Sequence, residues 1–389
     1  MAGQTRDGGW VFYFAANLQI ADDTIVYQVN AYFTEVMHVA INRIEINDFT
    51  VFNNITVDAC PGVNVLIGEN GTGKTHLLKI IYAFCGHEVE REGSENGELG
   101  YHKVFHNKLN NYFQNAGYAR LAHRHTEHPA NQITFDFNVS NDIYNFVITP
   151  DFSNNIEIHN VRGIHEVRWL LTVKKAIPSV YIPAKEMLTH SGLEKDFAER
   201  NLPFDATHID ILNKVGVSTV KTLCDNMQGL LSKISSIIGG PVLYQNDSYF
   251  INKGDKGPVE FIAEAEGFKK YGLLYRLIET GHLKKGSVLL WDEPEANINP
   301  KLIPDLVEII LELSRNDVQI FIATHDYMFA KYFEVRRKEG DKVRFHSLHK
   351  TGDGVKCEHN EYFRDLKENP IIDAFDMLMD EILGKNLGD

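Results

Sequence analysis

Residues 63–84 read VNVLIGENGTGKTHLLKIIYAF, and this stretch decides the fold. Its first five residues have the apolar character of a buried strand. The apolar side chains after the glycine-rich turn recur at helical spacing. Between them, Gly68–Thr75 fits the phosphate-binding pattern G-x-x-x-x-G-K-[ST] at every fixed position. A strand, such a turn and a helix in this order predict a P-loop nucleotide-binding protein.

The loop residues suit phosphate binding chemically. Glycines let backbone N–H groups turn inward around phosphate oxygens, and the N-terminus of the next helix adds partial positive charge. We expect Lys74 to reach the β- and γ-phosphates of ATP and the Thr75 hydroxyl to ligate Mg²⁺. The flanks disfavour the alternative, a plain strand-to-helix turn with an exposed lysine. The predicted ATP-binding residues are Gly68, Glu69, Asn70, Gly71, Thr72, Gly73, Lys74, Thr75 and His76.

Composition limits the other classes of function. The chain has 389 residues, enough for one large domain with insertions or for two lobes. It has 39 basic and 53 acidic residues, and the net charge of −14 argues against general nucleic-acid coating, although a local basic groove could coexist with it. Four scattered cysteines favour neither a disulfide framework nor a zinc site. We expect a cytoplasmic protein, because no apolar run approaches the roughly 20 residues of a membrane span and the N-terminus lacks the charged-then-apolar order of a signal peptide.

The rest of the chain alternates between strand and helix patterns. Residues 10–36 and 40–59 read as strands of an antiparallel sheet ahead of the nucleotide core, and Met37 is either an alternative start or an internal core methionine. Apolar spacing becomes helical over 193–238. A short helix is expected at 108–114, and strands are expected at 133–139, 144–149 and 156–161. The domains we expect are 1–190 with the phosphate loop, a helical insertion at 191–245, and 246–389 with the rest of the core.

Two further strands end in residues suited to ATP chemistry. GSVLLWDEPEANINP, residues 286–300, places four apolar residues before Asp292 and Glu293. Opposite a phosphate loop, the first acid holds Mg²⁺ and the second orients the attacking water. VQIFIATHD, residues 318–326, ends another strand at His325, where a donor can sense the γ-phosphate. One helix separates the strands, so we expect them to lie side by side.

A third segment marks a helix start. EAEGFKKYGLLYRLIETG, residues 264–281, has an amphipathic pattern after Gly267. We expect the backbone at Glu266 and Gly267 to form a helix N-terminus that faces solvent.

The order of these motifs resembles the ABC-type ATPases, most closely the soluble prokaryotic branch related to SMC, RecF and overcoming-lysogenization-defect ATPases. VYIPAKEML (180–188), LPFDATHIDIL (202–212) and AEGFKKYGLLYRL (265–277) resemble a large set of bacterial AAA-family proteins of this branch, and the resemblance covers 38–335. It implies an α/β P-loop NTPase fold of ABC-ATPase type with an N-terminal antiparallel β-subdomain and a helical insertion.

The resemblance also implies roles. Gly68–Thr75 is the Walker A loop, Asp292 the Walker B carboxylate, Glu293 the catalytic base and His325 the switch histidine. EANINP (295–300) is the D-loop. The signature segment, which closes over the nucleotide of a partner subunit in such ATPases, corresponds to Ala265, Glu266 and Gly267, with alanine where many relatives have serine. Lys185 and Glu186 lie in about the place of a Q-loop, which stays unassigned.

Several functions fit these motifs. The first is a homodimeric or higher-order ATPase that closes on ATP and controls a separately encoded nuclease or toxin, of the kind found in bacterial anti-phage modules. The alternative is a DNA-repair or chromosome-handling ATPase that grips DNA itself, which the charge and the missing coiled coil disfavour. A transporter motor is disfavoured by the degenerate signature. A fused nuclease is disfavoured because only 64 residues follow His325, whereas a nuclease domain needs about 100.

Weaker signals each leave two interpretations. The histidine-rich 122–131 is a metal site or, more simply, a loop. Lys269–Lys270, Lys284–Lys285 and the basic run 336–338 contact nucleic acid or are solvated charge. The helical segment 193–238 is the expected docking surface for an effector.

Overall fold

The structure is a computed structural model that describes residues 2–4, 10–12, 20–21, 24–25, 39–85, 108–114, 132–139, 142–148, 177–190 and 205–386. The chain divides into two compact units, Met1–Val36 and Met37–Asp389. In the first unit, β1 (Ala2–Gln4) pairs with β2 (Trp10–Phe12) and β3 (Ile20–Ala21) pairs with β4 (Thr24–Ile25), both antiparallel. The second unit holds every candidate site residue. The expectations for 122–131 and 156–161 lie outside the described residues.

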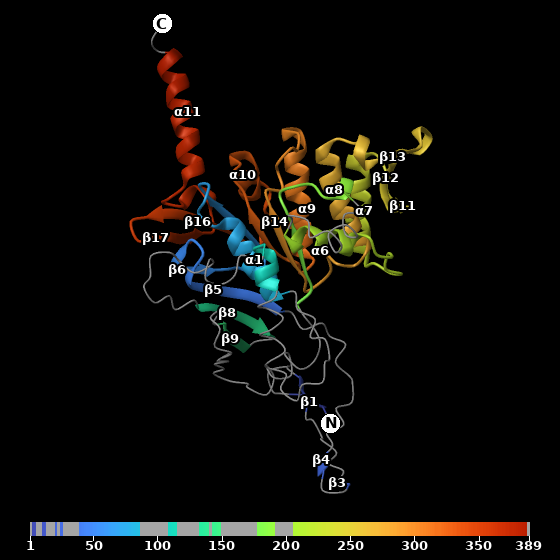
Figure 1. Cartoon of the computed structure of the whole chain (residues 1–389), viewed down its shortest axis with the longest axis horizontal. Helices are drawn as coiled ribbons and strands as arrows, with labels where there is room; N and C mark the ends of the chain where they lie inside the picture. Colours follow the sequence, from blue (N-terminus) through green and yellow to red (C-terminus); the bar gives the residue numbers. More distant parts are fainter. Residues whose placement is uncertain are drawn as a thin grey trace. The chain divides into compact units, whose positions relative to one another are not determined.

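A six-stranded sheet forms the centre of the second unit (Figure 1). Its order is β10-β14-β15-β7-β16-β17, parallel except for β17. The predicted adjacency of the acidic strand and the histidine strand is confirmed, because Asp292 pairs in register with Ala323. The strands are β7 (Val63–Gly68), β10 (Ser179–Ile182), β14 (Val288–Asp292), β15 (Gln319–Ala323), β16 (Val343–Thr351) and β17 (Gly354–Asn360).

Apolar cores cover both faces of this sheet, as expected for parallel strands. Alternate residues of β7 enter different cores: Val65 joins one cluster and Leu66 the other. The first cluster includes side chains of six helices that follow the phosphate-loop helix, and the second includes that helix, α1. The helices are α1 (Lys74–Cys85), α6 (Ala206–Val215), α7 (Asp225–Ile238), α8 (Glu266–Glu279), α9 (Ile303–Arg315), α10 (Tyr327–Arg336) and α11 (Pro370–Asn386).

A second, antiparallel sheet packs on the α1 side, in the order β6-β5-β8-β9. Its strands are β5 (Val39–Phe49), β6 (Phe52–Asp58), β8 (Gln132–Val139) and β9 (Asp142–Ile148). The sheet is not built only from residues ahead of the phosphate loop, because β8, which follows α1 in the sequence, pairs with β5. Gln319 joins the sheets: its Oε1 accepts from Ile41 N at 2.9 Å and its Nε2 donates to Ile41 O at 2.7 Å.

The expected helices of the 193–238 segment are present as α6 and α7, and residues 108–112 are helical as predicted. A small antiparallel sheet of β11 (Val242–Gln245), β12 (Ser248–Asn252) and β13 (Pro258–Glu260) follows α7, and the sequence did not predict it. The short 3-10 turns are η1 (Leu188–His190), η2 (Gly254–Lys256), η3 (Phe261–Ala263), η4 (Pro300–Leu302) and η5 (Phe363–Asp365). Within the described residues, no helix combines the length and apolarity needed to cross a bilayer.

Candidate nucleotide-binding site

The phosphate loop joins β7 to α1 as predicted, and two of its glycines are sterically required. Gly68 has φ 148°, and a Cβ there would lie 2.2 Å from the carbonyl oxygen of Leu348. Gly73 has φ 90°, and a Cβ there would lie 2.5 Å from Cζ of Phe52. The loop is thus held between β16 and the antiparallel sheet in a backbone shape that only glycine adopts readily.

Lys74 is a buried cation at the first position of α1. Its side chain is buried, and Nζ donates to the carbonyl oxygens of Gly68 at 2.8 Å and Glu69 at 2.9 Å. Burial lowers the pKa of Lys74 to about 8, although the carboxylates of Asp292 and Glu293 oppose this shift. The ammonium is therefore mostly charged at neutral pH and poorly solvated. Such a group gains from contact with an anion.

Thr75 and Asp292 meet, although 217 residues separate them. The Thr75 hydroxyl donates to Asp292 Oδ2 at 2.7 Å, and the hydroxyl of Tyr181 lies 3.5 Å from the same oxygen. Burial raises the pKa of Asp292, and the hydrogen bond from Thr75 opposes this. Two hard oxygens side by side fit Mg²⁺, which takes few protein ligands and fills its octahedron with water and phosphate oxygens. The described residues contain no cluster of three or more His, Cys, Asp or Glu side chains that could hold a metal ion by themselves.

Glu293 and His325 also come together. Oε1 of Glu293 lies 3.6 Å from Nε2 of His325, and both side chains are partly exposed. Glu293 has φ 47°, and its N–H donates to the carbonyl of Ala323 at 2.9 Å, which fixes the acid at the ends of β14 and β15. Burial and the nearby charge of Lys74 lower the pKa of His325, while Glu293 opposes the shift. The imidazole is therefore neutral at physiological pH.

Lys270 supports this acid, a role that the sequence analysis missed. Its Nζ donates to the carbonyl oxygens of Glu293 at 2.9 Å and Pro294 at 3.2 Å. Burial lowers the pKa of Lys270 to about 8. Lys269 is buried too, and its Nζ lies 2.6 Å from Glu266 Oε1. Both interpretations of this pair from the sequence, nucleic-acid contact and solvated charge, are therefore wrong.

Glu295 is a second acid that the sequence analysis did not single out. Its Oε1 accepts from the Thr324 hydroxyl at 2.6 Å and from the N–H of His325 at 3.4 Å. Its buried Oε2 finds no hydrogen-bond donor among the described residues. Burial raises the pKa of Glu295 to about 7. The sequence signals were its place in the run DEPE and at the start of EANINP, the expected D-loop.

Lys350 is a further residue near the loop. From β16, its Nζ donates to the carbonyl oxygen of Asn70 at 3.1 Å and lies 3.7 Å from Oε2 of Glu69. No local pattern predicts this contact, because it depends on β16 pairing with β7 across 280 residues of chain.

Two predicted binding residues, His76 and Gly267, are not oriented as expected. The ring of His76 packs edge-on against Phe113, with centroids 5.1 Å apart, and burial lowers its pKa to about 4. Only its backbone amide, in the first turn of α1, suits phosphate binding. Gly267 is buried, and a Cβ there would lie 3.5 Å from Cα of Ile298 in the D-loop of the same chain. The expectation that Gly267 faces solvent is therefore wrong, whereas Ala265 and Glu266 are exposed.

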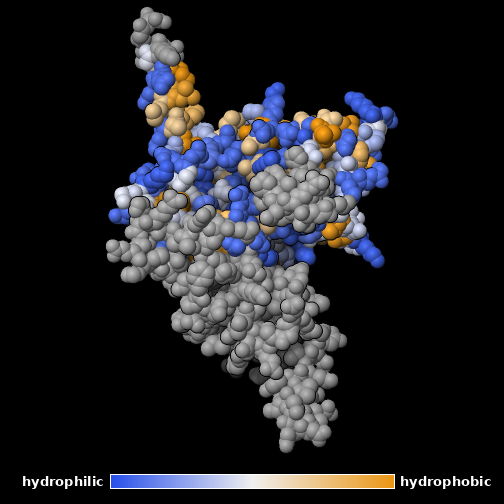
Figure 2. Space-filling model, in the orientation of Figure 1, coloured by the Kyte–Doolittle hydropathy of each residue, from blue (hydrophilic) through white to orange (hydrophobic). Residues whose placement is uncertain are grey.

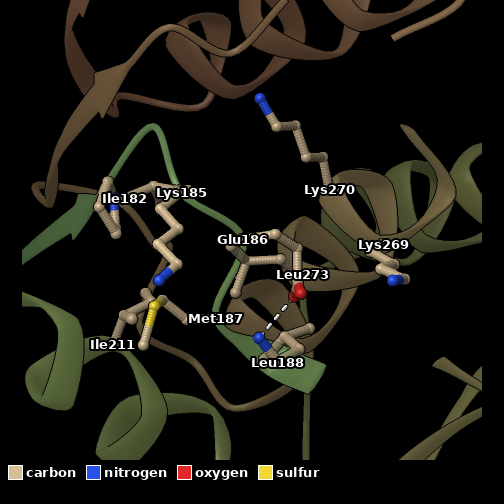
Figure 3. A pocket seen from close by; sticks show the side chains of 10 residues that line it. Ile182, Lys185, Glu186, Met187, Leu188, Ile211, Lys269, Lys270 and Leu273 are labelled. Atoms are coloured by element: carbon tan, nitrogen blue, oxygen red, sulfur yellow. Dashed lines mark hydrogen bonds between the residues drawn. The ribbon is translucent and has the colours of Figure 1, made fainter. Parts of the chain in front are cut away.

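The segment after β10 lines a small pocket beside α8 (Figure 3). Glu186 points toward η1, where its Oε1 accepts from Leu188 N at 2.5 Å and its Oε2 from Thr189 N at 3.3 Å. Lys269 and Lys270 point apart in this view. Glu186 is thus held locally as a cap, and the geometry gives it no contact with the phosphate loop.

Comparisons with known proteins bear on the family and the fold. Residues 43–200 match a family described as "AAA domain", and residues 192–329 match one described as "AAA domain, putative AbiEii toxin, Type IV TA system". The chain is 32% identical over 63 residues to the DNA replication and repair protein RecF of Limosilactobacillus fermentum, and 43% identical over 45 residues to that of Staphylococcus epidermidis. These alignments cover 16% and 12% of this chain and only 17% and 12% of the two relatives.

Among solved structures, the Smc head domain of Pyrococcus furiosus, with an extended coiled coil and bound to the C-terminal domain of ScpA, is similar in fold. Its TM-score is 0.50 at 12% identity, and the match covers 88% of this chain and 99% of that one. This likeness bears on the fold alone and agrees with the predicted α/β fold of ABC-ATPase type. The chain therefore contains two segments that match AAA-domain families, and its fold is similar to that of an Smc head domain.

Proposed function

We propose that the protein binds and hydrolyses ATP with Mg²⁺, closes into a homodimer when ATP is bound, and controls a separately encoded effector. The 2.7 Å hydrogen bond between Thr75 and Asp292 carries the proposal. The Thr75 hydroxyl and the Asp292 carboxylate lie side by side, next to a buried lysine and an acid–histidine pair, and this arrangement supports a site for Mg²⁺ and ATP. We assign Gly68–Thr75 and the amide of His76 to nucleotide binding, Thr75 and Asp292 to the metal, and Glu293 to the base.

Each residue has a defined task in this proposal. Thr75 and Asp292 would hold Mg²⁺, which would supply charge neutralisation at the phosphates. Lys74 exchanges its carbonyl acceptors for phosphate oxygens, which satisfy a buried ammonium better. Glu293 orients the attacking water and accepts its proton. His325, neutral at pH 7, donates one hydrogen bond toward the γ-phosphate and is held in place by Glu295.

The dimer rests on the exposed start of α8. Ala265 and Glu266 face solvent at a helix N-terminus, where the helix dipole favours an anion such as a partner's γ-phosphate. Gly267→Arg does not test this contact cleanly, because its side chain meets Ile298 of its own chain. Ala265→Glu is the better variant, since Ala265 is exposed at the N-cap of α8 and a carboxylate there would repel the partner's γ-phosphate. Mixed with Lys74→Ala, it should restore one composite site and partial turnover; no recovery would count against the sandwich.

The effector is proposed as a nuclease or toxin of a bacterial defence module in the cytoplasm. The description of the family that matches 192–329, which names a toxin of a toxin–antitoxin system, supports this. The similarity to RecF supports the alternative, an ATPase that handles DNA directly. The burial of Lys269 and Lys270 and the net charge of −14 favour the first candidate.

ATP turnover tests the enzymatic part. Lys74→Ala should abolish phosphate release and sharply weaken ATP binding, because the β- and γ-phosphates lose their cation. The matched control is Lys256→Ala, since Lys256 is an exposed lysine of η2. Normal turnover in the Lys74 variant, or equal loss in both, would remove the active-site assignment.

Binding to a short DNA duplex separates the two candidates. A DNA-handling ATPase should bind it more tightly with ATP, and the binding should weaken steeply as salt rises. We expect no ATP-dependent binding at about 0.15 M salt. Tight, ATP-dependent DNA binding would favour the alternative.

A further inference from the structure

Helix α11 is the most exposed apolar element of the described residues. Every residue from Asp373 to Gly384 is exposed. Six of the twelve large apolar side chains that are exposed in the described part of the chain lie on this one helix: Phe375, Met377, Leu378, Met379, Ile382 and Leu383. Figure 2 shows hydrophobic surface along one side of α11 and hydrophilic surface along the other. A helix of this length gains little stability on its own in water, and an apolar face normally becomes buried.

The apolar positions form a stripe. Ile371, Phe375, Leu378 and Ile382 follow one another at intervals of four, three and four, which is the spacing of a coiled-coil seam. Ile371 is buried and anchors the base, whereas Leu378 is 53% and Ile382 43% exposed. Met379 and Leu383 widen the stripe on one side. Met377 does not belong to it, because residues two apart do not share a helix face.

The edges of the stripe are mostly acidic, and Lys385 near the end of α11 is the one basic residue of this helix. Asp376 and Asp380 lie one turn from Met379 and Leu383, and Glu381 lies one turn after Leu378. A second copy of the helix would therefore bring acid against acid, whether parallel or antiparallel. A partner with basic edges meets no such repulsion and gains from each opposed pair.

The base of α11 contacts the site region. The ring of Phe375 stacks on Tyr327, with centroids 4.4 Å apart and planes 4° from parallel. Tyr327 begins α10, two residues after His325. A partner bound to α11 would thus contact a helix that packs against α10, and α10 begins two residues after His325.

We propose that α11 is a docking helix for a partner that presents an amphipathic helix with a leucine-type apolar face edged by lysine or arginine. That this partner is the effector rests on the proposed function; the docking itself does not. The helical segment 193–238, expected from the sequence to dock the effector, is less suited. The apolar side chains of α7 at Met227, Leu230, Ile234 and Ile238 are buried, and its exposed positions include Gln228, Ser232 and Ser236.

Two synthetic peptides test the proposal on the full chain without nucleotide. Both carry three heptads with leucine at a and d; one has lysine at e and g, the other glutamate. Fluorescence anisotropy should show the lysine peptide binding about tenfold or more tightly, with a difference that shrinks from about 0.05 M to about 0.5 M salt. The paired change Leu378→Asp and Ile382→Asp should abolish binding, and Met377→Ser should leave it unchanged.

A charge exchange makes the test independent of helix stability. Asp376→Lys with Asp380→Lys should reverse the preference toward the glutamate peptide. Equal binding of both peptides, binding of neither, or loss of binding in the Met377 variant would overturn the proposal. So would self-association of the nucleotide-free chain that the Leu378 and Ile382 changes abolish, because the occupant would then be a second copy. ATP turnover, measured on the same samples, reports separately on the proposed enzyme function.

Discussion

Glu295→Gln should change how the stability of the protein depends on pH. Burial raises the pKa of Glu295 from 4.5 to about 7, so the folded protein binds its proton more tightly than the unfolded chain. The resulting stabilisation is complete below pH 4.5 and is lost as pH rises to 7. Because each pH unit in this interval is worth about 1.4 kcal/mol, the loss amounts to roughly 3 kcal/mol. Glutamine keeps the acceptor for Thr324 and cannot ionise, so the variant escapes this loss.

Urea unfolding of both proteins between pH 5 and pH 8.5 measures the effect. The free energy of unfolding of Glu295→Gln, relative to the wild type, should rise by roughly 2 to 3 kcal/mol across this range and level off above pH 7. Any fixed cost of the new amide cancels, because only the change with pH counts.

Glu308→Gln is the matched control, because the expected sign is opposite. Burial raises the pKa of Glu308, but its 2.8 Å contact with Arg315 and the neighbouring charges bring the net pKa below its usual value. Its stabilisation is therefore present above pH 4.5, so the control should be less stable than the wild type by a constant amount from pH 5 to pH 8.5. A flat difference for Glu295→Gln, or one that falls with pH, would refute the buried-acid argument.

Three further variants test the site. Thr75→Val removes the hydroxyl that lies 2.7 Å from Asp292 and keeps the shape of the side chain. Because a metal ligand is lost, Mg²⁺-dependent phosphate release in a coupled-enzyme assay should fall on the order of tenfold or more. Turnover equal to that of the wild type would contradict the metal assignment. Ala265→Ser should stabilise the protein by about 1 kcal/mol in urea unfolding, because position 265 is the N-cap of α8 with extended backbone angles and gains a capping hydroxyl; unchanged stability would argue against this helix start. Lys270→Met removes a cation donating to two carbonyls and should lower both stability and turnover, whereas loss of neither would exclude a supporting role at Glu293.

The sequence predicted the parts of the site whose signals are local. Gly68–Thr75 is recognisable because glycines, lysine and threonine must stand at fixed spacing around phosphates. The strand ending at Asp292 and the strand ending at His325 were predicted to be neighbours, because a single helix connects them. The structure confirms this adjacency.

The rest depends on contacts between distant segments. Lys350 reaches the phosphate loop only because β16 pairs with β7. Likewise, β8 pairs with β5 although α1 lies between them in the sequence. Lys269 and Lys270 of α8 were expected at the surface, because two adjacent lysines in a sequence do not reveal buried acceptors. In the structure Lys269 donates to Glu266, and Lys270 donates to the carbonyl oxygens of Glu293 and Pro294. Gly267 was placed correctly at the start of a helix, but its orientation toward Ile298 is set by packing against the D-loop.

The central claim is that ATP closes two subunits on each other, and light scattering of Glu293→Gln tests it most directly. This variant keeps Lys74, Thr75 and Asp292 for ATP and Mg²⁺ but lacks the base, so it should bind ATP and hydrolyse it slowly. With Mg²⁺ and ATP the molar mass should rise from the 44.3 kDa of one chain to about twice that value and return when the metal is chelated. A mass that stays the same with and without ATP, in protein shown to bind the nucleotide, would contradict the account.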